Sequence, residues 1–473
     1  MKRKGRLLLV LGLVFLVQAG GIAWSQVTER ASVDSAGVEG NNASTASSNS
    51  SDGRYVAFES SATNLVAGDT NNRPDVFVHD RQTGTTTRVS VDSVGAEGDD
   101  ISTAPSISSD GRYVAFQSDA TNLVGGDTNP FSDIFVHDLL ADTTTLVSVD
   151  STGAQDIGPS SSPSVSSNGR YVAFQSDADL VVADTGVAPD IYVHDRDADE
   201  DGIYDEAGAI STVRVSVRSD GTEADRASAA PSISGDGRYV AFESFATNLV
   251  GVGNDTNGFF DVFVHDRQTG ATTRVSVDSA GAEGIGGDSS SCSISADGRY
   301  VAFVSDATNL VANDTNGSTD VFVHDRQTGT TTRVSVDSAG AEGNGISNFP
   351  SISSDGRYVA LESDADNLVA DDNNGSADVF VHDLQTGATT RVSKDSAGVE
   401  GNGNSNAPSI SADGRSVAFE SDADNLVAGD TNMAPDIFVD DLQAGAGEGG
   451  GGDGDGGCFI ATAAYGSRIS GEK

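Results

Sequence analysis

The stretch Pro350-Ser351-Ile352-Ser353-Ser354-Asp355-Gly356-Arg357-Tyr358-Val359-Ala360 joins two short apolar segments through a tight polar turn. The Asp-Gly-Arg turn at its centre begins at Asp52, Asp110, Asp236, Asp297, Asp355 and Asp413, and Asn168-Gly169-Arg170 is a further copy. Successive copies are separated by 58, 58, 68, 61, 58 and 58 residues. Seven nearly equal units in one chain indicate a repeat architecture.

Each unit contains four strand signals. In the fifth copy they cover 291–295, 299–305, 320–325 and 332–337, with apolar residues alternating along the second and third segments. Asp297-Gly298 and Thr328-Gly329 lie at the bends, where tight hairpins require residues with positive φ. Four antiparallel strands in each of seven units predict an all-β fold, a seven-bladed β-propeller of four-stranded antiparallel blades.

The two ends of the chain predict how the ring closes. The seventh unit has three strand signals, which end near Asp441, and then passes into glycine-rich sequence. The missing fourth strand is found at the N-terminus, where Arg30-Ala31-Ser32-Val33-Asp34-Ser35 matches Arg88-Val89-Ser90-Val91-Asp92-Ser93. An N-terminal strand that completes blade 7 would close the ring and remove two exposed sheet edges.

The run from Pro350 to Ala360 resembles the repeat of TolB-type, WD40-like propellers, in which Pro-x-Trp-Ser-Pro-Asp-Gly-Lys precedes an apolar strand. The resemblance covers roughly residues 27–443, and it departs in lacking the Trp and the second Pro. It implies the propeller fold and a tendency to bind a partner.

The N-terminus has the features of a secretory signal. Four basic residues precede the apolar run 7–17, which is shorter than the roughly 20 residues that span a bilayer. Ala23-Trp24-Ser25 fits a cleavage site. We therefore expect a signal peptide over 1–25, the propeller over 26–443, a Gly/Asp-rich linker over 444–457 and a tail over 458–473. The protein is expected to be exported to the periplasm, the cell surface or the medium, without a transmembrane anchor.

Acidic residues dominate the charge. Removal of residues 1–25 takes away four basic residues and no acidic one, which changes the net charge from −44 to −48. This charge argues against nucleic acid as a partner because phosphate binding needs a cationic surface. We expect a monomeric propeller that binds a protein or polysaccharide partner.

One turn breaks the symmetry of the repeat. Blade 3 is ten residues longer than the common 58 because its third hairpin contains Asp197, Asp199, Asp201, Ile203 and Asp205. Oxygen ligands at positions 1, 3 and 5, a Gly at position 6 and a carbonyl at position 7 suit a compact Ca²⁺ loop. Asp205 is the further ligand at position 9, as in the hairpin calcium loops of integrin-type propellers, which this turn resembles. We therefore predict Ca²⁺ as a structural cofactor; the alternative is an acidic surface hairpin.

A second acidic pattern recurs in the long loops. Asp69-Thr70-Asn71 with Asp75 is the first copy, and related copies occur in the other blades. Two interpretations stay open. Asp and Asn side chains can cap turns by bonding their own backbone, which we favour, or they can supply oxygen ligands to a cation.

No catalytic constellation is visible in the sequence. Gly-x-Ser-x-Gly and zinc-type His or Cys spacings do not occur. Six His residues occupy one position on the third strand of blades 1 to 6, so the ring holds them apart, and we expect a structural hydrogen-bonding role. The sequence favours a non-catalytic binding scaffold; the alternative is a propeller enzyme that acts on polysaccharide, such as a lyase or glycosidase.

The tail carries a separate motif. Cys458-Phe459-Ile460 opens a run that resembles the Cys-Phe-Ile box at the C-termini of many exported bacterial proteins, where a sorting or attachment role is suspected. The alternative is an unstructured tail with an exposed thiol.

Overall fold

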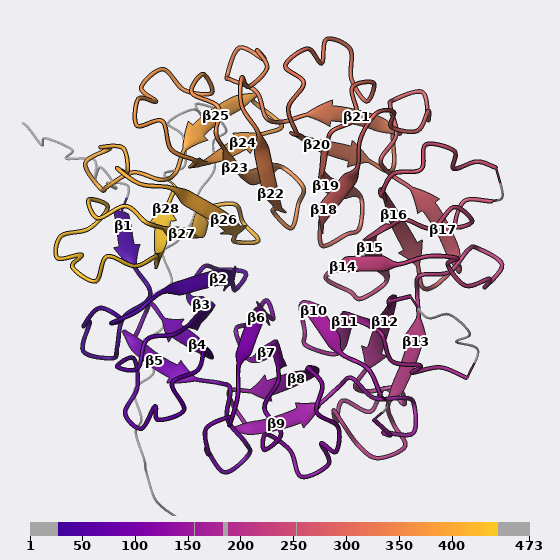
Figure 1. Cartoon of the computed structure of the whole chain (residues 1–473), viewed down its shortest axis with the longest axis vertical. Helices are drawn as coiled ribbons and strands as arrows, with labels where there is room; N and C mark the ends of the chain where they lie inside the picture. The colour runs from indigo at the N-terminus through magenta and orange to yellow at the C-terminus, as the bar shows by residue number, and fades with distance from the viewer. Residues whose placement is uncertain (1–26, 156, 183–187, 252, 443–473) are drawn as a thin grey trace, which may run out of the picture.

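The computed structural model describes residues 27–155, 157–182, 188–251 and 253–442. These residues form 28 β-strands arranged as seven four-stranded sheets around a central axis (Figure 1). Neighbouring strands within each sheet are antiparallel, as in the pairs β19–β20 and β20–β21. The predicted seven-bladed β-propeller is thereby confirmed. The expected signal peptide, the Gly/Asp linker and the Cys-Phe-Ile tail lie outside the described residues.

The strands follow one another blade by blade. Blade 1 consists of β2 (Ser44–Asn49), β3 (Tyr55–Ser60), β4 (Asp75–Asp80) and β5 (Thr85–Arg88); blade 2 of β6 (Ser102–Ile107), β7 (Tyr113–Ser118), β8 (Asp133–Asp138) and β9 (Thr143–Leu146); blade 3 of β10 (Ser160–Val165), β11 (Tyr171–Ser176), β12 (Asp190–Asp195) and β13 (Ser211–Arg214). Blade 4 consists of β14 (Ser228–Ile233), β15 (Tyr239–Ser244), β16 (Asp261–Asp266) and β17 (Ala271–Arg274); blade 5 of β18 (Ser289–Ile294), β19 (Tyr300–Ser305), β20 (Asp320–Asp325) and β21 (Thr330–Arg333). Blade 6 consists of β22 (Ser347–Ile352), β23 (Tyr358–Ser363), β24 (Asp378–Asp383) and β25 (Ala388–Arg391); blade 7 of β26 (Ser405–Ile410), β27 (Ser416–Ser421), β28 (Asp436–Asp441) and β1 (Val27–Arg30).

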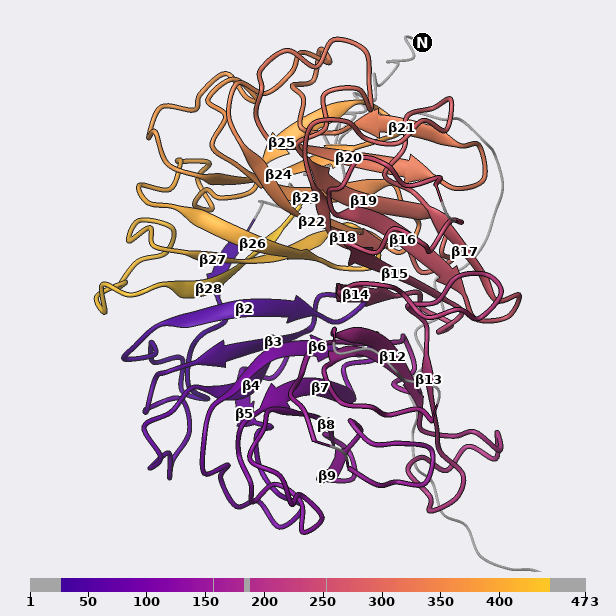
Figure 2. The same ribbon diagram turned by 45° about the vertical axis from the view of Figure 1, so that its right-hand side comes forward.

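The ring closes through β1. This strand pairs with β28 in antiparallel register, with Val27 opposite Asp441 and Arg30 opposite Phe438. Both views place the indigo β1 beside the yellow strands of the last blade (Figure 1 and Figure 2). The offset N-terminal strand predicted from the sequence is therefore present, and the first and last blades are joined by hydrogen bonds.

A circle of backbone hydrogen bonds joins the seven first-to-second turns, next to the innermost strands. One residue in each turn donates its backbone N–H to the carbonyl oxygen of the corresponding residue in the following blade, at 3.0–3.1 Å. Ala412 of blade 7 donates in the same way to Ser51 of blade 1. The members are Ser51, Ser109, Ser167, Gly235, Ala296, Ser354 and Ala412. All of them are small, which lets seven chains approach one another around the axis. Only a closed ring completes this circle.

The hydrophobic core lies between the blades. Val301, Ala302 and Phe303 are consecutive residues of β19, yet all three are fully buried. The sequence predicted alternation along this strand, as in a sheet with one solvent-exposed face. Here both faces of a blade contact neighbouring blades, so consecutive apolar residues are buried on opposite sides. The resulting clusters each combine two adjacent blades.

The glycine of each repeated turn meets two demands. Gly356 has a φ of +72°, and a Cβ at this position would lie 2.1 Å from Cδ2 of Tyr300 in the preceding blade. Such a distance is far below van der Waals contact, so a side chain is excluded by packing as well as by backbone conformation. The same Tyr–Gly contact recurs at Tyr55 and Gly111.

The fourth strands are shorter and begin earlier than predicted. In blade 5 the strand is Thr330–Arg333 rather than 332–337. Val334 still donates to the carbonyl of Val321 in β20, and the residues after it form a local loop in which Val336 pairs with Glu342. The prediction was wrong because Val334 and Val336 continue the apolar alternation of a strand, although they lie after β21 in the connection to the next blade. Within the described part of the chain, no helix is long and apolar enough to cross a membrane.

Candidate metal sites

The extended hairpin of blade 3 gathers three of the predicted ligands. Oxygens from Asp197, Asp199 and Asp201 all lie within 4.8 Å of one another. Asp197 is buried, whereas Asp199 and Asp201 are exposed. The group therefore has one fixed carboxylate at its base and two that reach it from the solvent side. Carboxylates at this separation form a donor set that could hold a metal ion.

The backbone of the hairpin holds this arrangement. The Asp197 carboxylate accepts hydrogen bonds from the N–H groups of Asp201 at 3.0 Å and Gly202 at 3.2 Å. Asp201 in turn accepts from the N–H of Ile203 at 2.9 Å. Gly202 has a φ of +86°, which permits the sharp bend that wraps the chain around the Asp197 carboxylate. The loop is therefore curled around its first acidic residue.

The remaining predicted ligands lie differently. Asp205 forms a two-pronged ion pair with Arg196, with Nε–Oδ1 at 2.9 Å and Nη2–Oδ2 at 2.5 Å. Its carboxylate is thus directed to the guanidinium and is not part of the acidic group. Ile203 has an exposed side chain, so its predicted contribution is its backbone carbonyl alone.

Aromatic contacts attach the hairpin to blade 2. The ring of Tyr204 lies 5.5 Å from that of Tyr113, and the guanidinium of Arg196 lies over both rings at 5.1 and 4.9 Å. The Tyr204 hydroxyl also donates to the carbonyl of Asn168 at 3.3 Å. These contacts make the base of the loop part of the packed ring and leave its acidic tip in solvent.

The long loops carry a second, repeated set of acidic groups. Each joins the Asp of the loop, the first residue of the third strand and a Glu from the connection to the next blade. They are Asp69, Asp75 and Glu97; Asp255, Asp261 and Glu283; Asp314, Asp320 and Glu342; and Glu39, Asp430 and Asp436. Sequence reasoning missed the Glu. Its constant place in the Gly-x-Glu-Gly connection was the available signal.

An arginine lies against the carboxylates of these groups. In blade 1, Nη1 of Arg88 lies 2.5 Å from Glu97 and 3.2 Å from Asp75. Burial raises the pKa of Asp75 to about 6, although hydrogen bonding to Ser90 and the charge of Arg88 act in the opposite direction. The guanidinium therefore neutralises part of a buried acidic group, and the rest of its negative charge needs a proton or another cation.

Blade 2 shows the same group in another form. Leu146 replaces the arginine, and Gln155 replaces the glutamate. The Gln155 amide donates to Asp133 at 2.5 Å and to Asp127 at 3.1 Å. One positive and one negative charge are lost together, so the formal charge of the group stays the same. This paired replacement indicates that the Arg and Glu belong to one electrostatic unit.

The asparagines of the long loops act as turn caps. The Oδ1 atom of Asn71 accepts from the N–H of Arg73 at 2.7 Å, and its amide donates to the carbonyl of Gly98 at 2.8 Å. Asn316 makes the matching pair of bonds to Ser318 and Gly343. The favoured turn interpretation is thus confirmed for these asparagines. The neighbouring Asp residues belong to the acidic groups.

The six histidines have structural partners. Nδ1 of His79 lies 2.9 Å from the Thr86 hydroxyl, which donates its own proton to the carbonyl of Val33 in the preceding connection. The imidazole of His79 therefore donates through Nδ1–H, and it is neutral when Nε2 carries no proton. The same contact is made by His137, His194, His265, His324 and His382. Burial lowers the pKa of each of these rings.

Comparison with known proteins supports the fold. No protein-family model matches the chain, and no curated protein matches it. An oligogalacturonate lyase in complex with manganese aligns over 89% of this chain and 96% of its own, at 13% identity and a TM-score of 0.50. The β-propeller domain of the Trilobed protease from Pyrococcus furiosus aligns over 84% and 95%, at 11% identity and a TM-score of 0.51. At these identities the likeness concerns the propeller fold alone.

TolB from Acinetobacter baumannii is also similar. It aligns over 82% of this chain and 80% of its own, at 15% identity and a TM-score of 0.37.

The Pyrococcus propeller is described as having an open velcro topology. By contrast, the present ring is closed by the pairing of β1 with β28.

Proposed function

We propose that this protein is an exported, non-catalytic β-propeller that serves as a binding scaffold in the bacterial envelope or outside the cell, with calcium as a structural cofactor in the blade 3 hairpin. The observation that carries the proposal is the group formed by Asp197, Asp199 and Asp201 on an otherwise nearly uniform ring.

Calcium fits this hairpin for chemical reasons. Ca²⁺ is a hard cation that prefers several oxygen ligands, and carboxylates at alternate loop positions supply them. Oxygens of the three carboxylates lie within 4.8 Å of one another, and a cation between them would offset their mutual repulsion. Asp197, Asp199 and Asp201 would hold the ion together with the Ile203 carbonyl. Asp205 joins them only if it leaves Arg196.

The scaffold role is supported by how the repeat uses its polar residues. The histidines bond to threonines, the acidic groups surround arginines, and the asparagines cap turns. Residues that carry catalysis in other proteins are therefore engaged in holding this ring together. The strongly acidic chain and the solvent-facing loops suit recognition of a partner.

A polysaccharide-active enzyme is the second candidate. The observation that favours it is the alignment with the lyase over nearly the whole propeller. Such a site would combine residues from several blades, as propellers present them at one face of the ring.

Calorimetric titration tests the calcium assignment. We expect metal-free protein to bind about one Ca²⁺ tightly, and Asp197→Asn to abolish this binding. Asp142→Asn is the matched control because Asp142 lies in the equivalent hairpin of blade 2 and has a φ of +55°, which Asn tolerates. Unchanged binding in Asp197→Asn would refute the hairpin assignment.

A pull-down from an envelope fraction tests the scaffold role. The mature protein is immobilised in Ca²⁺, and saturable capture of one polypeptide or polysaccharide is expected. Incubation with acidic polysaccharides, followed by analysis of the chain length of the products, tests the alternative. Depolymerisation that a substitution in one blade abolishes would replace the scaffold with an enzyme.

A further inference from the structure

The seams between adjacent blades fall into two classes. The residue after the third strand is arginine in four blades and leucine in three. The arginines are Arg81, Arg196, Arg267 and Arg326, and the leucines are Leu139, Leu384 and Leu442. Ser416 faces Arg81, but the other three arginines face a tyrosine of the preceding blade, so these three seams show what the leucine seams lack.

In an arginine seam the guanidinium bridges two blades. Arg326 lies 4.6 Å above the ring of Tyr239 in the preceding blade and donates to the carbonyl of Gly298 in its own turn at 2.5 Å. Arg238 covers the same tyrosine ring at 4.7 Å. Tyr239 therefore lies in contact with two guanidinium groups. Arg267 repeats the arrangement over Tyr171 at 4.5 Å.

The seam between blades 5 and 6 has the same frame without this arginine. Arg299 lies over the ring of Tyr300 at 4.6 Å, but Leu384 occupies the position that corresponds to Arg326. A cavity of about 460 Å³ opens here, lined by Tyr300, Leu384 and the turn residues Asp355 and Gly356. Leu384 lines this cavity at the position that arginine holds in the seam between blades 4 and 5, and the volume is larger than a guanidinium group.

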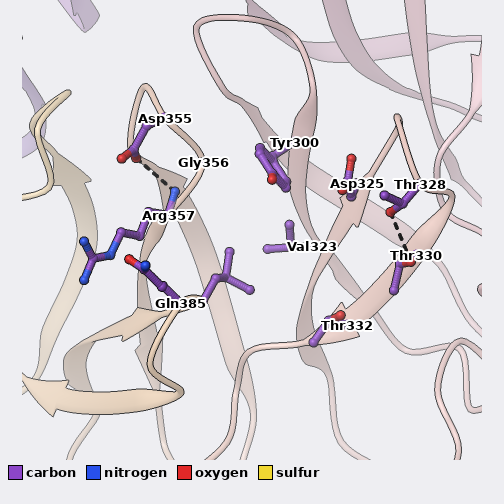
Figure 3. Close-up of a pocket in the computed structure, with 11 residues that line it drawn as sticks. Tyr300, Val323, Asp325, Thr328, Thr330, Thr332, Asp355, Gly356, Arg357 and Gln385 are labelled. Atoms are coloured by element: carbon purple, nitrogen blue, oxygen red, sulfur yellow. Dashed lines mark hydrogen bonds between the residues drawn. The ribbon is translucent and has the colours of Figure 1, made fainter.

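The cavity wall retains the groups that recognise a cation. In Figure 3, Asp355 lies to the left of Tyr300, and Thr328, Thr330 and Thr332 of blade 5 lie to its right; all of them line the cavity. Arg357 extends away from Tyr300 in this view, and it pairs with Asp383 at 2.8 Å and stacks on Tyr358. It therefore does not take the place of the missing arginine. An aromatic face beside carbonyl and carboxylate oxygens is a recognition surface for a planar cation.

We propose that this cavity binds the guanidinium of an arginine side chain presented by a polypeptide partner. The inference deepens the proposed binding role and rests on it for the partner, although the cation site can be tested alone. The incoming guanidinium takes the place that Arg326 holds at Tyr239: it stacks on Tyr300 and donates to the turn of Gly356. The net charge of −44 favours the approach of a cationic partner.

Methyl NMR of Leu- and Val-labelled protein tests the site directly. N-acetyl-arginine amide is the probe, and N-acetyl-citrulline amide is its neutral control of the same shape. We expect a saturable shift of the Leu384 and Val323 methyl signals at roughly millimolar concentrations of the arginine compound. Binding of the citrulline compound should be at least about tenfold weaker. Equal shifts with both compounds, or none at these methyl groups, would overturn the proposal.

Two reciprocal variants exchange arginine and leucine at corresponding positions of two seams, so that each seam is a control for the other. Leu384→Arg should fill the cavity from within and abolish the shift at Val323. Arg326→Leu should create an equivalent cavity beside Tyr239 and produce a new saturable shift at Val264, which corresponds to Val323. Retention of the Val323 response in Leu384→Arg would show that the probe binds elsewhere.

The outcomes separate this proposal from the scaffold role. If a partner is captured by the wild-type protein and by Leu384→Arg alike, the scaffold role stands and the arginine cavity is refuted as its docking site. If the arginine compound binds but no partner is captured, the cavity stands as a guanidinium site and the scaffold role fails.

Discussion

The hydroxyl of Thr28 donates a hydrogen bond of 2.7 Å to the carbonyl oxygen of Lys394, across 366 residues of sequence. Thr28 belongs to β1, and Lys394 lies in the connection from blade 6 to blade 7. The same contact joins consecutive blades elsewhere, as in the bond from Thr86 to Val33. The N-terminal strand therefore makes the contact of a regular fourth strand to the preceding blade, whereas Asp440 replaces the histidine that contacts the threonine in the other blades.

Deletion of residues 27–36 should sharply lower the melting temperature. It removes β1, exposes the edge of β28 and opens the cluster in which Ala31 packs with residues of blades 1 and 7. Thermal unfolding followed by circular dichroism measures the effect. Deletion of 446–455, which removes the same number of residues from the Gly/Asp linker, is the control; an equal melting temperature for both variants would contradict the closed ring.

Arg88→Leu should destabilise the protein by about 3–5 kcal/mol, because it leaves the buried carboxylate of Asp75 and the half-buried carboxylate of Glu97 without their cation. The double variant Arg88→Leu/Glu97→Gln should recover much of this loss, since blade 2 already carries Leu146 and Gln155. Chemical denaturation of the wild type, both single variants and the double variant gives the coupling energy. Additive losses would show that the two residues act independently.

Gly111→Ala should cost more stability than Gly84→Ala. Both glycines have positive φ, +73° and +70°, so the backbone strain of about 1 kcal/mol is shared. A Cβ at Gly111 would lie 2.1 Å from the ring of Tyr55, whereas a Cβ at Gly84 meets nothing within 4 Å. The difference between the two free energies of unfolding isolates the contact between blades. Equal losses would mean that backbone conformation alone requires the glycine.

Removal of metal should loosen the blade 3 hairpin. Without a cation, Asp197, Asp199 and Asp201 repel one another, and the exposed tip opens more often. We expect limited proteolysis in a chelator to cut first between residues 199 and 206, with cleavage suppressed by added Ca²⁺. Mass spectrometry locates the cut. A hairpin cleaved at the same rate with and without Ca²⁺ would argue against the metal.

The buried histidines predict a pH dependence. Burial lowers the pKa of His265 to about 4, below the value of about 6.5 in the unfolded chain. Between these values the unfolded state binds more protons, so this residue makes the free energy of unfolding increase as pH rises. His265→Asn should reduce the slope in this window. Denaturation at several pH values tests the difference between the two proteins, in which the contributions of other groups cancel. Identical slopes would contradict burial of the neutral ring.

The sequence by itself determined the number of blades, the order of strands and the closure by residues 27–30. These features depend on turn residues and apolar spacing that repeat about every 58 residues, so they can be recognised from the sequence without the structure. The acidic group at Asp197, Asp199 and Asp201 does not repeat, but it was predictable from the local sequence. Its members are near neighbours in the chain, and one tight turn brings them together.

The tertiary structure decided which side chains pair across the loops and between the blades. Asp205 lies against Arg196, and Glu97 joins Asp75, because the folded loops bring together residues that the repeat pattern does not relate. The cavity at Tyr300 likewise combines residues of two blades, with Leu384 of blade 6 at the position that arginine holds in other seams. A repeat sequence specifies each blade, but the contacts between blades arise only when seven of them close around one axis.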